Sequence, residues 1–143
     1  MAISRKKQEA INKVYAMERK VAEYRRIPEF RYSWKDYSRN TVWALENIAK
    51  SVENLLSEEI PMPSEKQINY LNILLSKDYV GSIREEYNKA INEGKMLNKY
   101  QATLLIGKLK LNDEYIYGHY PNIGSNDFDI LFDEMSNIIS LMK

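Results

Sequence analysis

Apolar residues recur every three or four positions between Ser4 and Arg26, and this spacing predicts a long first helix. The stripe consists of Ala10, Val14, Met17, Val21 and Tyr24. Two apolar positions in seven are typical of a helix hairpin within one chain, and equally of a seam between two copies in a homodimer. Pro28 is expected to close the helix, because a residue that precedes proline avoids the α region.

A second helix is expected from Thr41 to Ser57, where another apolar face repeats with helical spacing. That face consists of Val42, Leu45, Ile48, Val52, Leu55 and Leu56. The length of this helix suits antiparallel pairing with the first, so residues 1–59 are expected to form a long helix hairpin. The connecting residues 29–40 are dense in aromatic and arginine side chains.

Residues 64–143 are expected to form a small helical module after the break at residues 60–63, where two prolines occur. Three helix starts carry a capping-box pattern, in which a polar cap precedes Gln or Glu by three positions. The pairs are Ser64 with Gln67, Ser82 with Glu85, and Asn98 with Gln101. The helix that begins at Ser82 is expected to end at Gly94. The two parts are expected to make one compact all-α domain.

The aromatic run at residues 115–120 interrupts the helical pattern, and predicts one short strand or a turn. A last helix is expected from about Asn126. Its apolar side consists of Phe128, Leu131, Phe132, Met135, Ile138, Ile139 and Met142. Burial of such a stripe contributes about 1.5–3 kcal/mol per large side chain, so we expect this helix to be docked.

Composition argues against catalysis. The chain has no cysteine, which excludes zinc fingers and thiol chemistry and fits a reducing cytoplasm. The only histidine, His119, lies among tyrosines and is expected to be an ordinary loop residue rather than a general base. No phosphate-binding glycine loop or nucleophile elbow occurs. We therefore expect no enzyme activity, no metal and no cofactor. No apolar run approaches about 18 residues, so no membrane span is expected.

The net charge of +1 conceals a strong asymmetry along the chain. Residues 5–39 have eleven Lys/Arg and five Asp/Glu, a net charge of +6, whereas residues 112–143 have a net charge of −5. Such asymmetry often indicates a charged partner. The alternative is that the two ends attract each other within one molecule.

The basic N-terminal segment is the first candidate binding surface. Its lysines and arginines can contact phosphates, and its interleaved aromatic rings can stack on bases or anchor a protein partner. The candidate residues are Arg19, Lys20, Arg25, Arg26, Arg31, Tyr32, Trp34, Lys35, Tyr37 and Arg39. The alternative is structural, with the cations on the solvated face of the hairpin and the aromatics at its end.

The acidic C-terminal segment is the second candidate surface, formed by Asp127, Asp129, Asp133 and Glu134. A calcium loop that began at Asp127 would need glycine at its sixth position and glutamate at its twelfth, and the chain has Phe132 and Ile138 there. These carboxylates could instead mimic nucleic-acid phosphates in the groove of another protein. The alternative is an ordinary solvated helix face.

Residues 63–109 resemble a helical module of phage, plasmid and bacterial DNA-metabolism proteins. Its opening pattern, S/T-x-K-Q-x-x-Y-L/I-x-x-L, matches SEKQINYLNIL at residues 64–74. Its closing pattern, L-S/T-K-x-x-A-S/T-x-L-I-x-x-L, is similar to LNKYQATLLIGKL at residues 97–109. Asn98 replaces Ser/Thr there and caps a helix equally well. The resemblance implies an association with DNA-handling proteins of mobile elements, and no catalytic residues.

Two functions are therefore expected. The first is a phage or mobile-element accessory protein that binds a host protein or nucleoprotein complex and inhibits or modulates it, similar in general character to small anti-CRISPR proteins. The second is a factor in phage replication or recombination that binds DNA or RNA directly.

Overall fold

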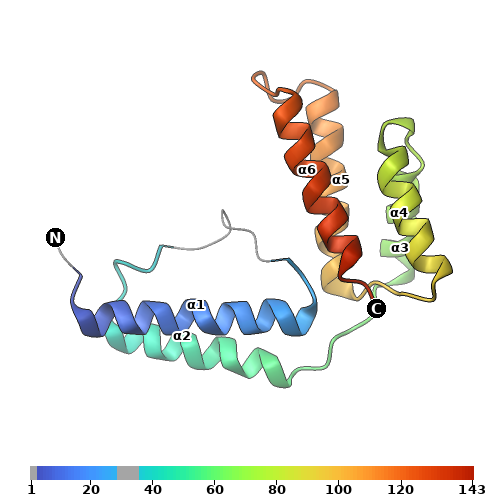
Figure 1. Cartoon of the computed structure of the whole chain (residues 1–143). Helices are drawn as coiled ribbons and strands as arrows, with labels where there is room; N and C mark the ends of the chain where they lie inside the picture. Colours follow the sequence, from blue (N-terminus) through green and yellow to red (C-terminus); the bar gives the residue numbers. More distant parts are fainter. Residues whose placement is uncertain (1–2, 29–35) are drawn as a thin grey trace. The chain divides into compact units, whose positions relative to one another are not determined.

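The computed structural model describes residues 3–28 and 36–143, and every regular element in that part of the chain is helical (Figure 1). This confirms the all-α class. The chain divides into two compact units, which are described separately. Unit 1 comprises residues 1–25 and 29–59, and unit 2 comprises residues 26–28 and 60–143.

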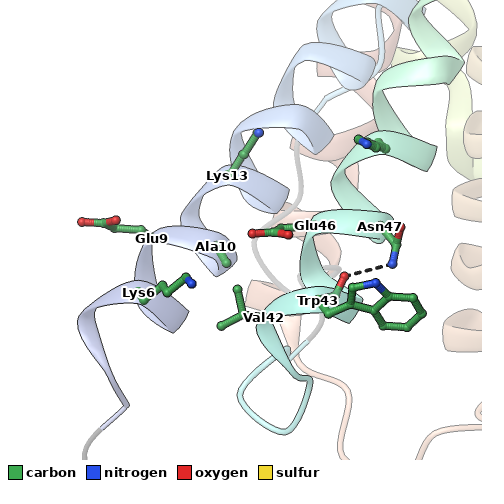
Figure 2. Close-up of a pocket in the computed structure, with 9 residues that line it drawn as sticks. Lys6, Glu9, Ala10, Lys13, Val42, Trp43, Glu46 and Asn47 are labelled. Carbon is green, nitrogen blue, oxygen red and sulfur yellow. Dashed lines mark hydrogen bonds between the residues drawn. The ribbon is translucent and has the colours of Figure 1, made fainter.

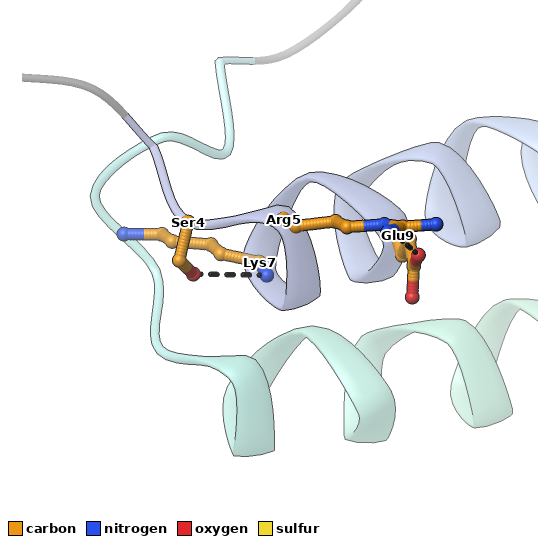
Figure 3. Close-up of polar contacts among 4 residues, drawn as sticks. All are labelled: Ser4, Arg5, Lys7 and Glu9. Atoms are coloured by element: carbon orange, nitrogen blue, oxygen red, sulfur yellow. Dashed lines mark hydrogen bonds and ion pairs between the residues drawn. The ribbon is translucent and has the colours of Figure 1, made fainter.

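Unit 1 begins with α1, Arg5–Arg25. The Ser4 hydroxyl accepts the Lys7 backbone N–H at 3.2 Å, and Arg5 pairs with Glu9 at 3.3 Å (Figure 3). The first contact satisfies one of the backbone donors that the start of a helix leaves unpaired.

The helix ends before the predicted break at Pro28. Arg26 has a φ of 55°, a left-handed conformation that stops an α-helix. The buried side of α1 consists of Ile11, Val14 and Val21. The predicted stripe included both valines but omitted Ile11.

The second helix, α2 (Val42–Asn54), continues into the short 3-10 turn η2 (Leu55–Ser57). The Thr41 hydroxyl caps it by accepting the Ala44 N–H at 3.1 Å. Both helices run in the same direction (Figure 1). Ala10 and Val42 line one groove near the helix starts, and the Tyr24 hydroxyl donates to the Glu58 carbonyl at 2.6 Å near their ends. The predicted antiparallel hairpin is therefore wrong.

The connecting segment is long enough to allow the parallel direction. A 21-residue helix is about 31 Å long, and at about 3.3 Å per residue the connecting residues 26–41 can return the chain to the start of α1. Tyr37 anchors this return halfway along α1. It is 7% exposed, its ring lies 5.6 Å from that of Tyr15, and its hydroxyl donates to Glu18. The core cluster of unit 1 consists of Ile11, Val14, Tyr37, Leu45 and Ala49.

Unit 2 contains four α-helices and one short 3-10 turn. They are α3 (Glu65–Leu75), η3 (Asp78–Val80), α4 (Gly81–Asn92), α5 (Lys99–Ile116) and α6 (Ser125–Ser140). α5 packs against both α3 and α6, and α6 also packs against α4. The apolar face predicted for the last helix is confirmed, because Leu131, Met135, Ile138 and Ile139 are buried.

Two of the three predicted capping boxes are confirmed, at Ser64 with Gln67 and at Asn98 with Gln101. The third is wrong. α4 begins at Gly81, Val80 stands at its cap position without a side-chain hydrogen bond, and Ser82 lies inside the first turn. The reason is that η3, with Val80 buried, leads the chain directly into α4.

The aromatic run at residues 115–120 is the end of a helix followed by a turn. Tyr115 and Ile116 belong to α5, and Gly118 has a φ of 74°, which glycine adopts without strain. The Tyr115 ring meets Phe128 edge-on, with centroids 5.7 Å apart. Of the two predicted alternatives, the turn is therefore confirmed. In the described part of the chain, no helix combines the length and apolar character needed to cross a bilayer.

Candidate functional site

The main candidate site is an open groove of about 480 Å³ between α1 and α2 of unit 1 (Figure 2). Ala10 and Val42 give it an apolar lining where the two helices are close. Polar and aromatic side chains complete the lining. They are Lys6, Glu9, Lys13, Trp43, Glu46, Asn47 and Lys50.

Two lysines of the groove, Lys6 and Lys13, belong to a row along α1 that continues beyond the groove to Lys20. Because seven residues make almost two helical turns, Lys6, Lys13 and Lys20 fall in one row on α1, about 10 Å apart. All three are exposed. Lys50 provides a cation from α2 on the opposite wall. The row can therefore meet several negative charges of an extended ligand at once.

Trp43 is the most exposed large hydrophobic side chain in the described part of the chain, at 75%. Its indole lies on the side of α2 turned away from α1 (Figure 2). The Asn47 side chain donates to the Trp43 carbonyl at 3.0 Å. Indole burial is strongly favourable in a folded core, so an indole left in solvent is available to a ligand.

Trp43 was not predicted as a site residue, because the neighbouring aromatic run at residues 29–40 is the denser cluster. A signal for it was nevertheless present in the pattern of α2. The apolar face of that helix passes through Val42 and Leu45, and Trp43 falls one position outside the face. A tryptophan on the polar side of an amphipathic helix is the observation that would have indicated this site.

The groove contains charges of both signs. Glu9 is paired with Arg5, and Glu46 lies on the α2 wall. The positive character belongs mainly to α1, which has seven basic and three acidic side chains. One of those acids, Glu18, accepts the Tyr37 hydroxyl. The basic side chains along α1 are therefore complementary to negative charge.

The predicted basic site is only partly brought together. Arg19 and Lys20 are exposed on α1, Arg25 is half-buried, and Arg39 is exposed before α2. Arg26 belongs to unit 2, where its carbonyl accepts the Gln101 amide at 2.8 Å. Four predicted residues lie outside the described part of the chain. They are Arg31, Tyr32, Trp34 and Lys35.

Tyr37 corrects one expectation directly. It was a candidate for stacking on bases, but its ring is buried in the core cluster of unit 1. This burial, together with the hydrogen bond to Glu18, raises the pKa of Tyr37 above its usual value. Tyr37 therefore acts in the fold and does not present its ring to a ligand.

Two of the four carboxylates in the predicted acidic surface make contacts within unit 2. Asp127 accepts the Gly124 N–H at 2.9 Å as part of the α6 cap. Glu134 pairs with Lys108 at 2.5 Å. Asp113, a carboxylate on α5 outside the predicted set, accepts the Tyr79 hydroxyl at 2.5 Å, and this bond raises the pKa of Tyr79. Asp129 and Asp133 are the exposed members of the set.

The described residues contain no group of three or more His, Asp or Glu side chains that could hold a metal ion. His119 is exposed in the turn between α5 and α6. No protein-family model, curated protein or solved structure matches the chain. Any functional assignment therefore depends on the chemistry of its surfaces.

Proposed function

We propose that the protein works without catalysis, by binding single-stranded nucleic acid along α1 and the α1–α2 groove. One observation supports this most directly. A row of exposed lysines, Lys6, Lys13 and Lys20, runs along α1, and the exposed indole of Trp43 projects from the α2 wall of the groove on the side away from α1 (Figure 2). Cations in a row and an open aromatic ring are the two elements that binding proteins for single strands combine.

The two elements would act on different parts of the ligand. The lysines would neutralise phosphates and release condensed counterions, which gives affinity without sequence preference. Trp43 would stack on a base, a contact that contributes about 1–3 kcal/mol. A paired base inside a duplex has both faces covered by its neighbours, so stacking on Trp43 favours a single strand. Glu46 in the groove limits the affinity.

The competing hypothesis is an inhibitor that imitates phosphates with its acidic C-terminal segment and so occupies a host nucleoprotein complex. It has less support, because Asp127 and Glu134 already make contacts within unit 2. The resemblance at residues 63–109 favours a place in the DNA metabolism of mobile elements under either hypothesis. Within that setting, direct binding is the function we favour.

The test measures binding of a fluorescein-labelled oligo(dT) strand and of a matching duplex at several salt concentrations. Trp43→Ala should weaken single-strand binding by about tenfold, equivalent to roughly 1.4 kcal/mol. Lys6→Gln with Lys13→Gln should reduce the slope of log affinity against log salt concentration by about 0.7 for each phosphate that is no longer neutralised.

The matched control is Lys89→Gln with Lys95→Gln, which removes the same charge from unit 2. These two substitutions should leave the affinity for oligo(dT) near that of the unaltered protein. The proposal would be abandoned if the unaltered protein does not bind oligo(dT), or if the groove and control variants bind equally well.

A further inference from the structure

A second surface, on α3 and α5 of unit 2, is not explained by the fold or by nucleic-acid binding. Both sequence patterns at residues 63–109 contribute to it. The fold accounts for part of each pattern, because Ser64 and Gln67 form a cap and Leu71, Ala102 and Leu105 are buried. Leu74, Leu97 and Leu109 are buried as well. Burial and capping do not account for the other pattern side chains, of which Lys66, Tyr70, Lys99 and Thr103 are exposed and Ile106 is half-buried.

These remaining side chains meet in one place. A surface pocket of about 300 Å³ lies between α3 and α5, and its lining comes from both patterns. The lining residues are Ser64, Lys66, Gln67, Tyr70, Thr103 and Ile106. The Gln67 amide donates to the Thr103 hydroxyl at 3.2 Å and so joins the two walls. Tyr70 remains 41% exposed beside it.

The pocket belongs to a longer apolar strip. Tyr70 and Ile73 lie on one side of α3, three positions apart, and Ile73 is 59% exposed. α3 and α5 run in the same direction, because Gln67 bonds Thr103 and Tyr79, beyond α3, bonds Asp113. Ile73 therefore lies further along the face than Ile106, toward the end of α5.

Lysines flank the strip. Lys66 lines the pocket from α3. On α5, Lys99 and Lys110 lie on the same side as Ile106, at helical spacings of seven and four positions, and both are exposed. We define the α3–α5 face by the exposed residues Lys66, Tyr70, Ile73, Lys99 and Lys110 and the half-buried Ile106.

We propose that the α3–α5 face is a docking surface for an acidic amphipathic helix of a partner protein. Two packed parallel helices leave a groove between them that a third helix can fill with anchors at every third or fourth position. Ile73 and Ile106 offer aliphatic surface, which favours leucine-like anchors over bases. The flanking lysines complement carboxylates on the edges of such a helix and set its orientation more than its affinity.

This proposal is independent of single-strand binding by unit 1. The probe is a fluorescein-labelled helical peptide with leucines along one stripe and glutamates on both flanks. The control is a scrambled peptide of the same composition, whose leucines do not fall on one side of a helix. The unaltered protein should bind the amphipathic peptide and bind the scrambled one at least about tenfold more weakly.

Ile73→Ser should weaken peptide binding by at least about tenfold if Ile73 is an anchor. The matched control is Ile130→Ser, because Ile130 is 50% exposed on α6, away from this face. Lys66→Glu with Lys110→Glu should weaken binding further and remove its dependence on salt. Far-UV circular dichroism of each variant tests whether the fold is retained. We expect that it is, because Ile73 and Ile130 are both exposed.

Three results would overturn the proposal. The amphipathic peptide does not bind, it binds no better than the scrambled peptide, or Ile73→Ser and Ile130→Ser have the same effect. Loss of oligo(dT) binding in Ile73→Ser, with no peptide binding, would instead assign the face to nucleic acid. The Trp43→Ala variant should bind the peptide normally, which separates this test from that of the unit 1 groove.

Discussion

The two units are built from the same kind of element but differ in how much core holds them together. Among the described residues, unit 2 buries sixteen apolar side chains over four helices, and unit 1 buries six over two. Small cores give little stability to spare. In unit 1 each buried side chain therefore has a larger share of the free energy of folding. Because unit 1 buries few side chains, more of its helix surface, including Trp43, is open to a ligand.

The units also differ in what determines their topology. In unit 2 the short connections and two capping boxes fix where helices start and which neighbours they meet. In unit 1 the long connection between α1 and α2 is compatible with either helix direction. Tyr37 packs against Tyr15 and donates to Glu18, and these contacts favour the parallel direction. Unit 1 should therefore be the more sensitive to substitution, and this difference can be tested.

The largest effect is expected from truncation of one fully buried leucine in each unit. Leu45→Ala and Leu105→Ala should each cost about 2–5 kcal/mol. That loss should unfold unit 1 but only lower the unfolding midpoint of unit 2. Trp43 fluorescence in a Trp34→Phe background reports on unit 1, and far-UV circular dichroism reports on all helices. Equal midpoints by both measures in Leu45→Ala would contradict the comparison.

Gln101 should come next in size. It is 1% exposed, and its amide donates to the carbonyls of Arg26 and Leu141, at 2.8 and 3.1 Å. Gln101→Leu would leave these acceptors without their donor, at a cost of about 1–3 kcal/mol in urea unfolding. Gln67→Leu is the comparison, because Gln67 has the same capping position and its amide donates to an exposed hydroxyl, that of Thr103, rather than to two backbone carbonyls. Equal losses in the two variants would assign the effect to capping alone.

Asn112 should give a change of opposite sign. It is fully buried in unit 2, and neither side-chain polar atom has a hydrogen-bond partner among the described residues. Because an unsatisfied buried amide is unfavourable, Asn112→Leu should raise the free energy of unfolding by about 1 kcal/mol. Thermal unfolding followed by circular dichroism measures this. A lower melting temperature in Asn112→Leu would show that the Asn112 amide stabilises the folded state.

The helix caps should give a smaller effect that tests a corrected prediction. Ser64→Ala should cost about 1 kcal/mol, because the Ser64 hydroxyl accepts the Gln67 N–H at 3.1 Å. Ser82→Ala should be nearly neutral, because Ser82 lies inside α4 rather than at its cap. Urea unfolding of both variants measures the difference. A loss at Ser82 as large as that at Ser64 would favour a cap at Ser82 after all.

The smallest effect is expected at alkaline pH. Burial and the Glu18 acceptor raise the pKa of folded Tyr37 above the unfolded value of 10.0. The resulting stabilisation is complete below about pH 10, and is lost as pH rises through the higher folded value. Tyr37→Phe should therefore reduce the alkaline loss of stability in unit 1, as measured by Trp43 fluorescence. An unchanged pH profile would mean that Tyr37 titrates alike in both states.

Sequence reasoning succeeded where the signal was local. Capping at Ser64 and Asn98, and the buried face of α6, follow from residues within a few turns of each other. It failed where the decision was made at a distance. Tyr37, a predicted binding residue, is buried against α1, and Glu134, a predicted surface residue, pairs with Lys108, 26 positions away. Trp43 differs from these cases, because the apolar pattern of α2 already places it outside the buried face.

The parallel pairing of α1 and α2 has an electrostatic consequence. Antiparallel helices place opposite ends of their macrodipoles together and nearly cancel them, whereas parallel helices place both positive ends at one end of the pair. Neither helix has an acidic residue in its first turn, and α1 begins Arg5, Lys6, Lys7. The positive charges at this end of unit 1 therefore repel one another, and together they attract anions. Added phosphate or sulfate should stabilise it more than chloride does.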